Sequence, residues 1–501
     1  MQKPNIIYIL ADDMGYGDVR YLNAECAFPT PNLDRMGREG MIFSDAHSSS
    51  AVCTPSRYSI MTGRYCWRTY LKRGVLGGAS GPLIDEERPT VANVLRDAGY
   101  RTACIGKWHM GWDWAVKDGH VAENKGWSKA PLDWIDFTKP ITRGPTTVGF
   151  DHFYGISGSL DMPPYVYVKD DMPVEVPTAW GTESEFCREG PRMESLRANN
   201  VLSHITERAC DWLGDQSAEQ PFFLYFPITA PHTPISPAPE FDGKSGINPY
   251  ADFCMEVDAR VGQILDRLDE LGLAENTMVI FTTDNGASKR PSECEALEQH
   301  YNHYCSYHFR GYKSDIWDGG HRLPFLVRWP AAVAAGTSCA EVVGLFDLYA
   351  TAVELTGAEA GSLGGEDSQS LLPLLRQQGV PSERKALVHH SIDGRFAVRR
   401  GQWKLCRCPG SGGWTLKDKD AEEQGLPPLQ LYDVEADPGE QTNLAEQHPE
   451  IVAELTTELH RIVASGRSVG AGEASNDGTD FADWPQVDWL HEIPAAYIAD
   501  D

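Results

Sequence analysis

The sequence predicts an α/β fold: a large, mostly parallel mixed sheet sandwiched by helices, followed by a smaller C-terminal α+β domain with a short antiparallel sheet. Three observations support this prediction. The chain has 501 residues, too many for one ordinary hydrophobic core. Strand-like and helix-like segments alternate over its first three quarters, as in parallel sheets. After about residue 375, short alternating segments take over. We therefore expect an α/β domain at 1–375 and the smaller domain, with an extended tail, at 376–501.

Each expected element follows from its hydrophobic pattern. The short apolar run at 5–11 has the length and composition of a buried strand. Residues 31–40 start with proline and end with glycine, which is typical of a short helix, and 251–272 has apolar residues at helical spacing. Two stretches rich in Gly, Pro and aromatic residues, 113–200 and 286–310, are expected to be long loops. Further strands are expected at 101–106, 221–227, 278–283, 396–399 and 403–406, and further helices at 89–98 and 448–463.

The composition argues against several classes of function. Hydrophobic residues make up 41% of the chain and charged residues 23%, which are globular values. A net charge of −28 argues against a nucleic-acid or anionic-membrane partner. No apolar run is long enough for a membrane span, and residues 5–10 are too few for a signal-peptide core. We expect a cytoplasmic protein, or a periplasmic or secreted one whose export signal is absent from this sequence. The 12 irregularly spaced cysteines do not make a disulfide scaffold.

Two pairs of polar residues, three of them aspartates, follow predicted strands. Asp12 and Asp13 end the first strand, and Asp284 and Asn285 end the strand at 278–283. Because ligands bind at the carboxyl ends of strands in open α/β sheets, the two pairs could converge on one ion. Three carboxylates and an amide oxygen are hard ligands that suit Ca²⁺ first and Mg²⁺ second. The alternative is that each pair is only a turn or a helix cap.

A nucleophile candidate lies at the start of a predicted helix. In the pentapeptide Cys-Thr-Pro-Ser-Arg at 53–57, Thr54 is a plausible N-cap and Pro55 suits the first helical position. Cys53 would then lie at a helix N-terminus, where backbone N–H groups favour an anion. Arg57, one turn later, could face the same side. Alternatively, Cys53 is an ordinary buried cysteine.

Cationic side chains follow other strands or lie in loops that face the crevice. Lys107 and His109 come after the strand at 101–106, and His232 follows the strand at 221–227. Lys313 precedes a Gly-rich turn that leads to His321. Any one of them alone would usually be a surface residue. Their shared position after strands favours a common anion-binding site.

Together these residues resemble the type I, formylglycine-dependent sulfatase family of the alkaline-phosphatase-like superfamily, in its bacterial carbohydrate and aryl sulfatase type. The resemblance covers nearly the whole chain and is specific in its combination of motifs. It rests on Asp12–Asp13, Thr30–Asp34, Cys53–Arg57, Gly106–Gly111, Ala230–His232, Thr283–Gly286, Lys313–His321 and the closing segments Leu431–Asp433, Asp437–Pro438 and Thr442–Leu444.

The resemblance implies an activity and a site. A maturation enzyme would oxidise Cys53 to formylglycine, whose hydrated gem-diol attacks the sulfur of a sulfate ester and later expels sulfate. His109 would be the base for sulfate release, and Arg57 would hold the hydrated aldehyde. Sulfate contacts are implied for Lys107, His232 and Lys313, with either of the last two protonating the leaving oxygen. The implied Ca²⁺ ligands are Asp12, Asp13, residue 53, Asp284 and Asn285.

The substrate is expected to be a sulfated small molecule or glycan, most simply a sulfated carbohydrate. His321 or Arg322 would contact a sugar hydroxyl or carboxylate. Sugar-stacking rings would come from Trp108, Trp112, Trp114, Trp127 and Trp134 unless these are ordinary core residues. Which sugar, and which of its hydroxyls carries the sulfate, stays open, as does the oligomeric state.

Two other functions remain compatible with the motifs. A phosphonate monoester or phosphodiester hydrolase of the same superfamily would use the same nucleophile and a similar anion cradle. A protein in which residue 53 stays cysteine would be a non-catalytic binder of sulfated glycans.

Overall fold

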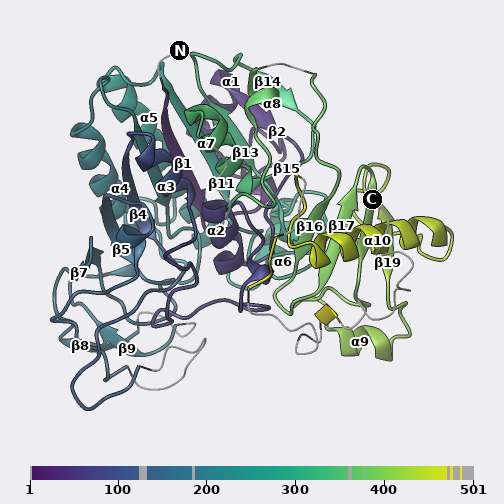
Figure 1. Cartoon of the computed structure of the whole chain (residues 1–501), viewed down its shortest axis with the longest axis horizontal. Coiled ribbons are helices and arrows are strands. Elements are labelled where there is room, and N and C mark those ends of the chain that lie inside the picture. The colour runs from purple at the N-terminus through teal and green to yellow at the C-terminus, as the bar shows by residue number, and fades with distance from the viewer. Residues whose placement is uncertain are drawn as a thin grey trace.

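A ten-stranded sheet forms the centre of the protein (Figure 1). The structure, a computed structural model, describes residues 3–122, 132–182, 187–358, 364–376, 379–470, 474–477, 484, 486 and 487. The strand order across the sheet is β14 (Thr337–Cys339), β2 (Met41–Phe43), β13 (Phe325–Arg328), β11 (Thr277–Thr283), β1 (Asn5–Ala11), β10 (Phe222–Pro227), β4 (Arg101–Lys107), β5 (His152–Ile156), β6 (Val168–Lys169) and β7 (Met172–Pro173).

The middle of this sheet is parallel and fully buried. β1 pairs in parallel with β10 on one side and with β11 on the other. β4 and β5 extend the parallel part, whereas β13 joins β11 antiparallel. Every residue of β1, β10 and β11 is buried, which explains their continuous apolar sequences, since parallel strands are covered on both faces. The α/β fold with a mostly parallel mixed sheet is confirmed.

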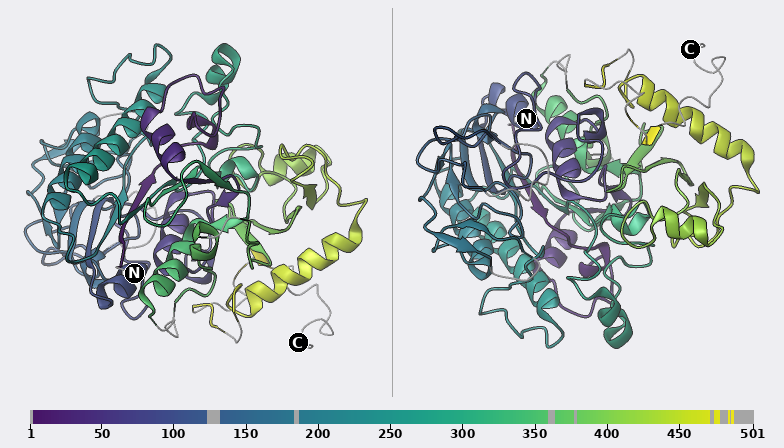
Figure 2. Two further views of the ribbon diagram at one scale, coloured as in Figure 1. Left: turned by 90° about the horizontal axis from the view of Figure 1, so that it is seen from above. Right: turned by 90° about the horizontal axis from the view of Figure 1, so that it is seen from below.

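Helices cover both faces of the sheet (Figures 1 and 2). α5 (Pro249–Glu270) packs between α1 (Pro31–Glu39) and α4 (Ala198–Gly214) in one layer. In the other layer, α7 (Leu348–Thr356) contacts α2 (Cys53–Thr62) and α3 (Val91–Asp97). α6 (Cys294–Tyr301) and α8 (Leu372–Arg376) complete this part. Two small sheets join β12 (Arg322–Leu323), β3 (Ala46–His47) and β15 (Val343–Gly344), and β8 (Ala179–Gly181) with β9 (Gly190–Arg192).

The C-terminal part has its own sheet and helix, on the right in Figure 1. Four strands pair antiparallel in chain order: β16 (Leu387–His390), β17 (Phe396–Arg400), β18 (Trp403–Cys406) and β19 (Gln430–Asp433). α10 (Pro449–Ala464) packs on β17 and β18, and α9 (Asp418–Glu423) lies before β19. This is the expected short antiparallel sheet. The expected domain boundary at 375/376 stays a prediction.

Two stretches expected to be loops contain regular structure. The region 113–200 includes β5, which joins the central sheet beside β4, and 286–310 includes α6. β5 could not be predicted from the sequence, because one of its five residues is Gly155 and glycine weakens a strand pattern. That glycine is required, since a Cβ there would lie 1.7 Å from the carbonyl oxygen of Gly106.

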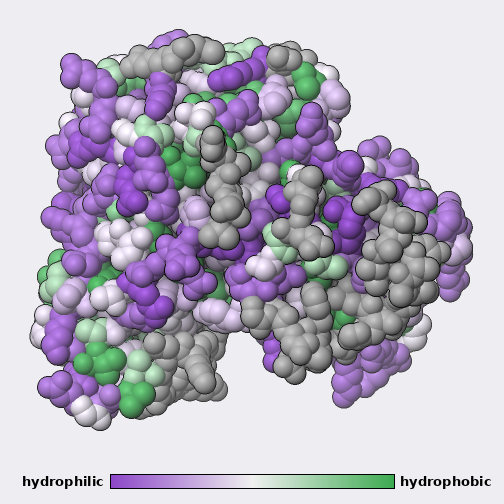
Figure 3. All heavy atoms as spheres, viewed as in Figure 1, coloured by the Kyte–Doolittle hydropathy of each residue, from purple (hydrophilic) through white to green (hydrophobic). Residues whose placement is uncertain are grey.

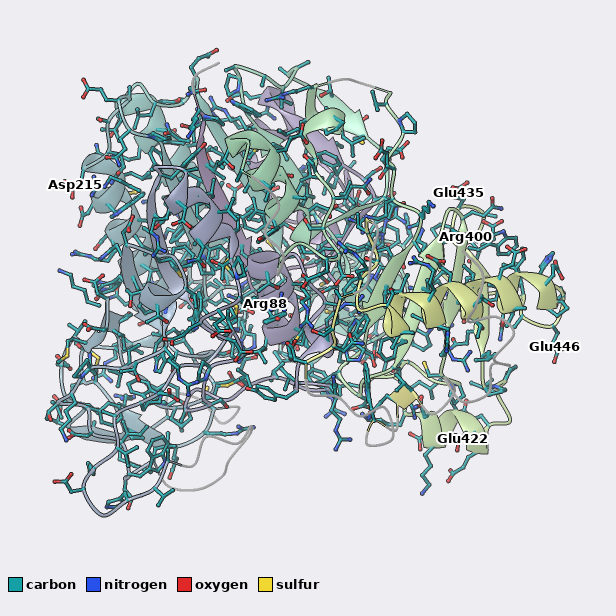
Figure 4. All side chains as sticks on the ribbon, viewed as in Figure 1. Arg88, Asp215, Arg400, Glu422, Glu435 and Glu446 are labelled. Atoms are coloured by element: carbon teal, nitrogen blue, oxygen red, sulfur yellow. The ribbon has the colours of Figure 1, made fainter. Side chains whose placement is uncertain are left out.

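The acidic residues lie mainly on the outer surface. Asp215, Glu422, Glu435 and Glu446 are all exposed, and Figure 4 shows them at the periphery of the molecule. The face in Figure 3 is mostly hydrophilic, with scattered apolar residues. Among the described residues, no helix is long and apolar enough to cross a membrane.

Candidate active site

The two polar pairs, Asp12–Asp13 and Asp284–Asn285, meet where β1 and β11 end side by side. The backbone N–H of Asp284 donates to the carbonyl of Ala11, which places Asp12 beside Asp284. Asn285 Nδ2 donates to Asp13 Oδ1 at 2.7 Å. Asp13 has a φ of 68°, a left-handed conformation that is uncommon and costly for a non-glycine residue. The strand ends therefore bring all four side chains together, as the sequence predicts.

These oxygens fit a divalent cation. Asp12 Oδ1 and Asn285 Oδ1 are buried and have no hydrogen-bond partner in the described part of the chain. Buried acceptors are normally satisfied, so such orphan oxygens indicate a group that the protein binds there. His232 Nε2 lies 3.6 Å from Asp13 Oδ2 at the edge of the same cluster. Carboxylate and amide oxygens match the ligands that Ca²⁺ and Mg²⁺ prefer.

Cys53 is the first residue of α2 and is 2% exposed. The expected cap was wrong by two residues, because Val52 and not Thr54 precedes the helix. The hydroxyl of Thr54 instead accepts a hydrogen bond from the backbone N–H of Leu76. Burial raises the pKa of the Cys53 thiol to about 11 despite nearby Lys107 and Lys313. As a thiol it would be neutral at pH 7 and a weak nucleophile.

Three cations balance the three carboxylates. Lys107 Nζ donates to Asp12 Oδ2 at 2.6 Å, and Lys313 Nζ donates to Asp13 Oδ2 at 2.7 Å. Arg57 is fully buried, and its Nε donates to Asp284 Oδ2 at 2.9 Å. Its Nη1 also donates to the carbonyl of Lys107, which ties α2 to the end of β4.

Burial and the neighbouring charges together shift the pKa values of Asp12 and Asp284 in opposite directions. Burial disfavours ionisation of Asp12, but Lys107, His232 and Arg57 outweigh it and hold the pKa of that carboxyl well below its usual range. Burial raises the pKa of Asp284, and the neighbouring Asp12 carboxylate adds to the effect. Such paired perturbations in a cleft are typical of functional sites.

The histidines differ in their environment. His109 Nε2 lies 2.8 Å from the carbonyl of Leu76, and because a carbonyl only accepts, this nitrogen carries the proton. His109 Nδ1 then has a free lone pair, buried and without a partner among the described residues. Burial, with Lys107 and Arg57 nearby, lowers the pKa of His109 well below its usual value, so the ring is neutral. In His232, Nδ1 donates to the carbonyl of Thr233, which leaves Nε2 facing Asp13.

A cavity of about 1020 Å³ opens onto this cluster. Asp13, Cys53, His232 and Lys313 line it, whereas Arg57, Lys107 and His109 are fully buried beneath. Cys53 at a helix N-terminus, Lys313 and the oxygen-rich cluster thus face one solvent-accessible space, with Lys107 buried beneath it. This arrangement is suited to binding a tetrahedral anion and attacking it from Cys53.

Comparison with known proteins decides the family. The family model Sulfatase matches residues 4–358. The chain belongs to the sulfatase family. It is therefore a sulfuric ester hydrolase. It is 32% identical to the N-acetylgalactosamine-6-O-sulfatase of Bacteroides thetaiotaomicron, over 92% of this chain and 93% of that protein.

One solved structure agrees with this family, and a second shares the fold. One, described with the metabolism of multiple glycosaminoglycans by Bacteroides thetaiotaomicron, aligns with a TM-score of 0.80 and 30% identity, over 93% of this chain and 100% of the other. The phosphonate monoester hydrolase of Agrobacterium radiobacter aligns with a TM-score of 0.58 and 18% identity, over 92% of this chain and 96% of the other. At that identity the likeness shows the shared fold alone.

Two predicted substrate contacts lie outside the cavity of the sulfatase. His321 is fully buried and stacks on His389, with ring centroids 3.8 Å apart. Arg322 donates to the carbonyl of Ser44 and lies beside Asp45. Neither residue lines the cavity. The expectation that they contact sugar is therefore corrected: they belong to a charge-balanced cluster that joins the catalytic part to β16 and β18.

The predicted stacking tryptophans of the sulfatase are core residues. None of those that the structure describes lines the cavity, and Trp127 lies outside the described residues. Trp112, for example, packs edge-to-face on both Trp114 and Phe153. The buried members of the set are Trp108, Trp112, Trp114 and Trp134.

Sequence reasoning missed most of the cavity lining, including Trp414 and Asp161. Trp414 lines the cavity and is 53% exposed, and Asp161 lines it with a buried Oδ1 that has no partner among the described residues. The signal for Trp414 was a large aromatic residue after Gly-Ser-Gly-Gly at 410–413, a place where no core strand or helix would need it. Asp161 gave no such signal.

Proposed function

We propose that this sulfatase hydrolyses sulfate esters of carbohydrates, with 6-sulfated N-acetylgalactosamine as the first substrate to test. The observation that carries the proposal is the convergence of Lys107 and Lys313 with Cys53 at a helix N-terminus, above buried oxygen ligands. The sugar comes from the relative named N-acetylgalactosamine-6-O-sulfatase, which aligns over nearly the whole chain.

Cys53 is proposed to act as formylglycine, made by a separate maturation enzyme. A buried thiol whose pKa is raised to about 11 is protonated at neutral pH and offers no reactive anion. The family resemblance supplies the alternative, a hydrated aldehyde that provides a hydroxyl nucleophile. Backbone N–H groups at the start of α2 face the charge that develops near residue 53.

The cluster of Asp12, Asp13, Asp284 and Asn285 is proposed to hold Ca²⁺, or less favourably Mg²⁺, together with residue 53. The orphan oxygens of Asp12 and Asn285 support this assignment. When bound, the cation supplies Lewis-acid polarisation of a sulfate oxygen and a fixed positive charge.

The protein's own side chains have separate tasks. Lys107 and Lys313 place two ammonium groups at the anion site, where they stabilise charge on the sulfate oxygens. Arg57 orients residue 53 and Asp284. His232 or Lys313 is positioned to protonate the leaving oxygen, since both line the cavity. His109 presents the lone pair of Nδ1 and is proposed as the base for sulfate release.

The first experiment identifies the nucleophile. The protein is produced together with a formylglycine-generating enzyme, and the peptide containing residue 53 is weighed. Formylglycine is about 18 Da lighter than cysteine. An unshifted mass in protein from the native host would leave a glycan binder as the better explanation.

The second experiment identifies the reaction. We expect kcat/KM for N-acetylgalactosamine 6-sulfate and for an aryl sulfate to exceed kcat/KM for an aryl phosphonate. The Cys53→Ala variant should turn over none of them. Preference for the phosphonate would replace the proposal with a phosphonate monoester or phosphodiester hydrolase.

A further inference from the structure

We propose that Trp414 and Asp161 form the sugar-recognition subsite of this cavity, with Trp414 stacking on the pyranose ring and Asp161 accepting hydrogen bonds from its hydroxyls. The proposal rests on the proposed function, because it concerns the sugar that carries the sulfate. It assigns part of substrate recognition to the C-terminal part of the chain, to which Trp414 belongs.

Trp414 occupies an unusual position for a tryptophan. It is 53% exposed and lines the same cavity as Cys53 and Lys313. Leu416, two residues later, packs against a buried cluster, whereas the indole of Trp414 belongs to no described hydrophobic cluster. A large aromatic face left in solvent at a cavity is a ready contact surface for an apolar ligand face.

The backbone that carries Trp414 is fixed against the anion site. The N–H of Trp414 donates to Ser314 Oγ at 2.9 Å, one residue after Lys313. The N–H of Thr415 donates to Asp315 Oδ1 at 3.2 Å, and the Thr415 hydroxyl bonds the other oxygen of the same carboxylate. These contacts set the position of Trp414 relative to the lysine at the anion site.

The glycine before Trp414 makes this close docking possible. A Cβ on Gly413 would lie 2.5 Å from the carbonyl oxygen of Ser314 and 2.6 Å from Asp315 Oδ1. Farther back in the loop, the carbonyl of Ser411 accepts from the N–H of Ile316 at 2.8 Å. The loop is therefore pre-organised, so little conformational entropy is lost when a ligand stacks on the ring.

Asp161 supplies the polar half of the subsite. It lies in the segment between β5 and β6, so it comes from the catalytic part of the chain. Its Oδ1 is buried without a partner among the described residues, and a carboxylate can accept hydrogen bonds from two neighbouring hydroxyls. A pyranose has an apolar face of C–H groups, on which Trp414 could stack, and hydroxyls at its rim, which could donate to Asp161. A sulfate on the exocyclic carbon would let the ester enter the anion site while the ring stays in the wider cavity.

The test compares Trp414→Ala and Trp414→Phe with Trp180→Ala, a matched control. Trp180 is 55% exposed and does not line the cavity. KM for N-acetylgalactosamine 6-sulfate should rise about tenfold or more in Trp414→Ala and much less in Trp414→Phe, since an aromatic ring restores stacking. Inhibition by inorganic sulfate, which needs only the anion site, should be unchanged in all three variants.

Asp161→Asn should also raise KM for the sulfated sugar and leave inhibition by inorganic sulfate unweakened. An unchanged KM in Trp414→Ala would overturn the proposal. An equal loss of affinity for the sulfated sugar and for inorganic sulfate would also overturn the proposal, because the loop would then serve only to position Lys313.

A binding experiment separates this proposal from the proposed function. Protein in which residue 53 is still cysteine is titrated calorimetrically with N-acetylgalactosamine 6-sulfate. Heat of binding that is present in the unsubstituted protein and lost in Trp414→Ala supports the subsite, even if no ester is hydrolysed. Equal binding by both proteins contradicts it, whatever the activity of the matured enzyme.

Discussion

Arg57 and Asp284 form a fully buried ion pair at the centre of the site, with Nη2 of the arginine 2.8 Å from Oδ2 of the aspartate. The same guanidinium approaches Asp12 and donates to the carbonyl of Lys107. One arginine therefore connects the nucleophile helix α2 to the ends of β1, β4 and β11. Its role is structural as well as electrostatic.

Replacing Arg57 by methionine should destabilise the fold by about 3–5 kcal/mol, because the buried carboxylates lose their partner. Arg57→Lys should cost less, since the charge remains while the paired hydrogen bonds are lost. Urea unfolding of the three proteins measures the difference. Equal stability of Arg57→Met and the unsubstituted protein would show that the carboxylates are compensated in another way.

Removing divalent cations should lower both activity and thermal stability. Treatment with EGTA would remove the cation from the oxygens of Asp12 and Asn285, which have no other partner among the described residues. We expect Tm to fall and to recover with Ca²⁺ more fully than with Mg²⁺. Asn285→Ala should require more Ca²⁺ for the same recovery, whereas the exposed Asn200→Ala should behave as the unsubstituted protein. An unchanged Tm after EGTA treatment of all three proteins would argue against bound Ca²⁺.

Acid should destabilise the protein in part through His390. Burial lowers the pKa of His390 to about 3, whereas an unfolded histidine titrates near 6.5. The folded pKa is depressed, so this contribution to stability is complete above pH 6.5 and is lost as the pH falls from 6.5 towards 3. The loss approaches about 1.4 kcal/mol per pH unit.

His390→Phe should reduce this pH dependence, and the new ring can pack on Phe396 as the imidazole does. Unfolding free energies between pH 4 and 7 measure the slope. His448→Phe, at a partly exposed position, is the control and should keep the slope of the unsubstituted protein. Identical slopes in the two variants would show that His390 is accessible to protons in the folded state.

His321→Ala and Arg322→Ala should affect stability and leave substrate affinity unchanged. Both side chains satisfy buried partners, so we expect losses of about 1–3 kcal/mol in unfolding free energy. KM for the sulfated sugar should stay within twofold of the unsubstituted value. A large rise in KM with normal stability would return these residues to a role in binding.

The sequence predicts which polar side chains come together wherever these side chains follow strand ends. Asp12 and Asp284 are found from the sequence because β1 and β11 are continuous apolar runs whose carboxyl ends must meet in a parallel sheet. Lys107 follows from the same reasoning, as the last residue of β4. These predictions depend only on local pattern and on the rules of sheet topology.

Other features could not be predicted, because they depend on how distant segments dock. Trp414 reaches the cavity because its loop packs on Ser314, a contact between residues 100 positions apart. His321 has the residue type and sequence neighbours of a site residue. In the fold, however, it is fully buried against His389 of β16. Local pattern cannot tell a charged residue that faces a ligand from one that satisfies a buried partner.

His109→Gln should separate the two halves of the reaction. Glutamine can still donate a hydrogen bond to the carbonyl of Leu76, as His109 Nε2 does, but it places no base at the position of Nδ1. If His109 serves sulfate release, the sugar alcohol should appear as a burst of about one equivalent per active site, followed by slow turnover. Rapid-quench kinetics measures the burst, and the exposed His120→Gln should show kinetics like the unsubstituted enzyme. A slow reaction without any burst would place His109 in the first step, because the base would then be needed before the alcohol leaves.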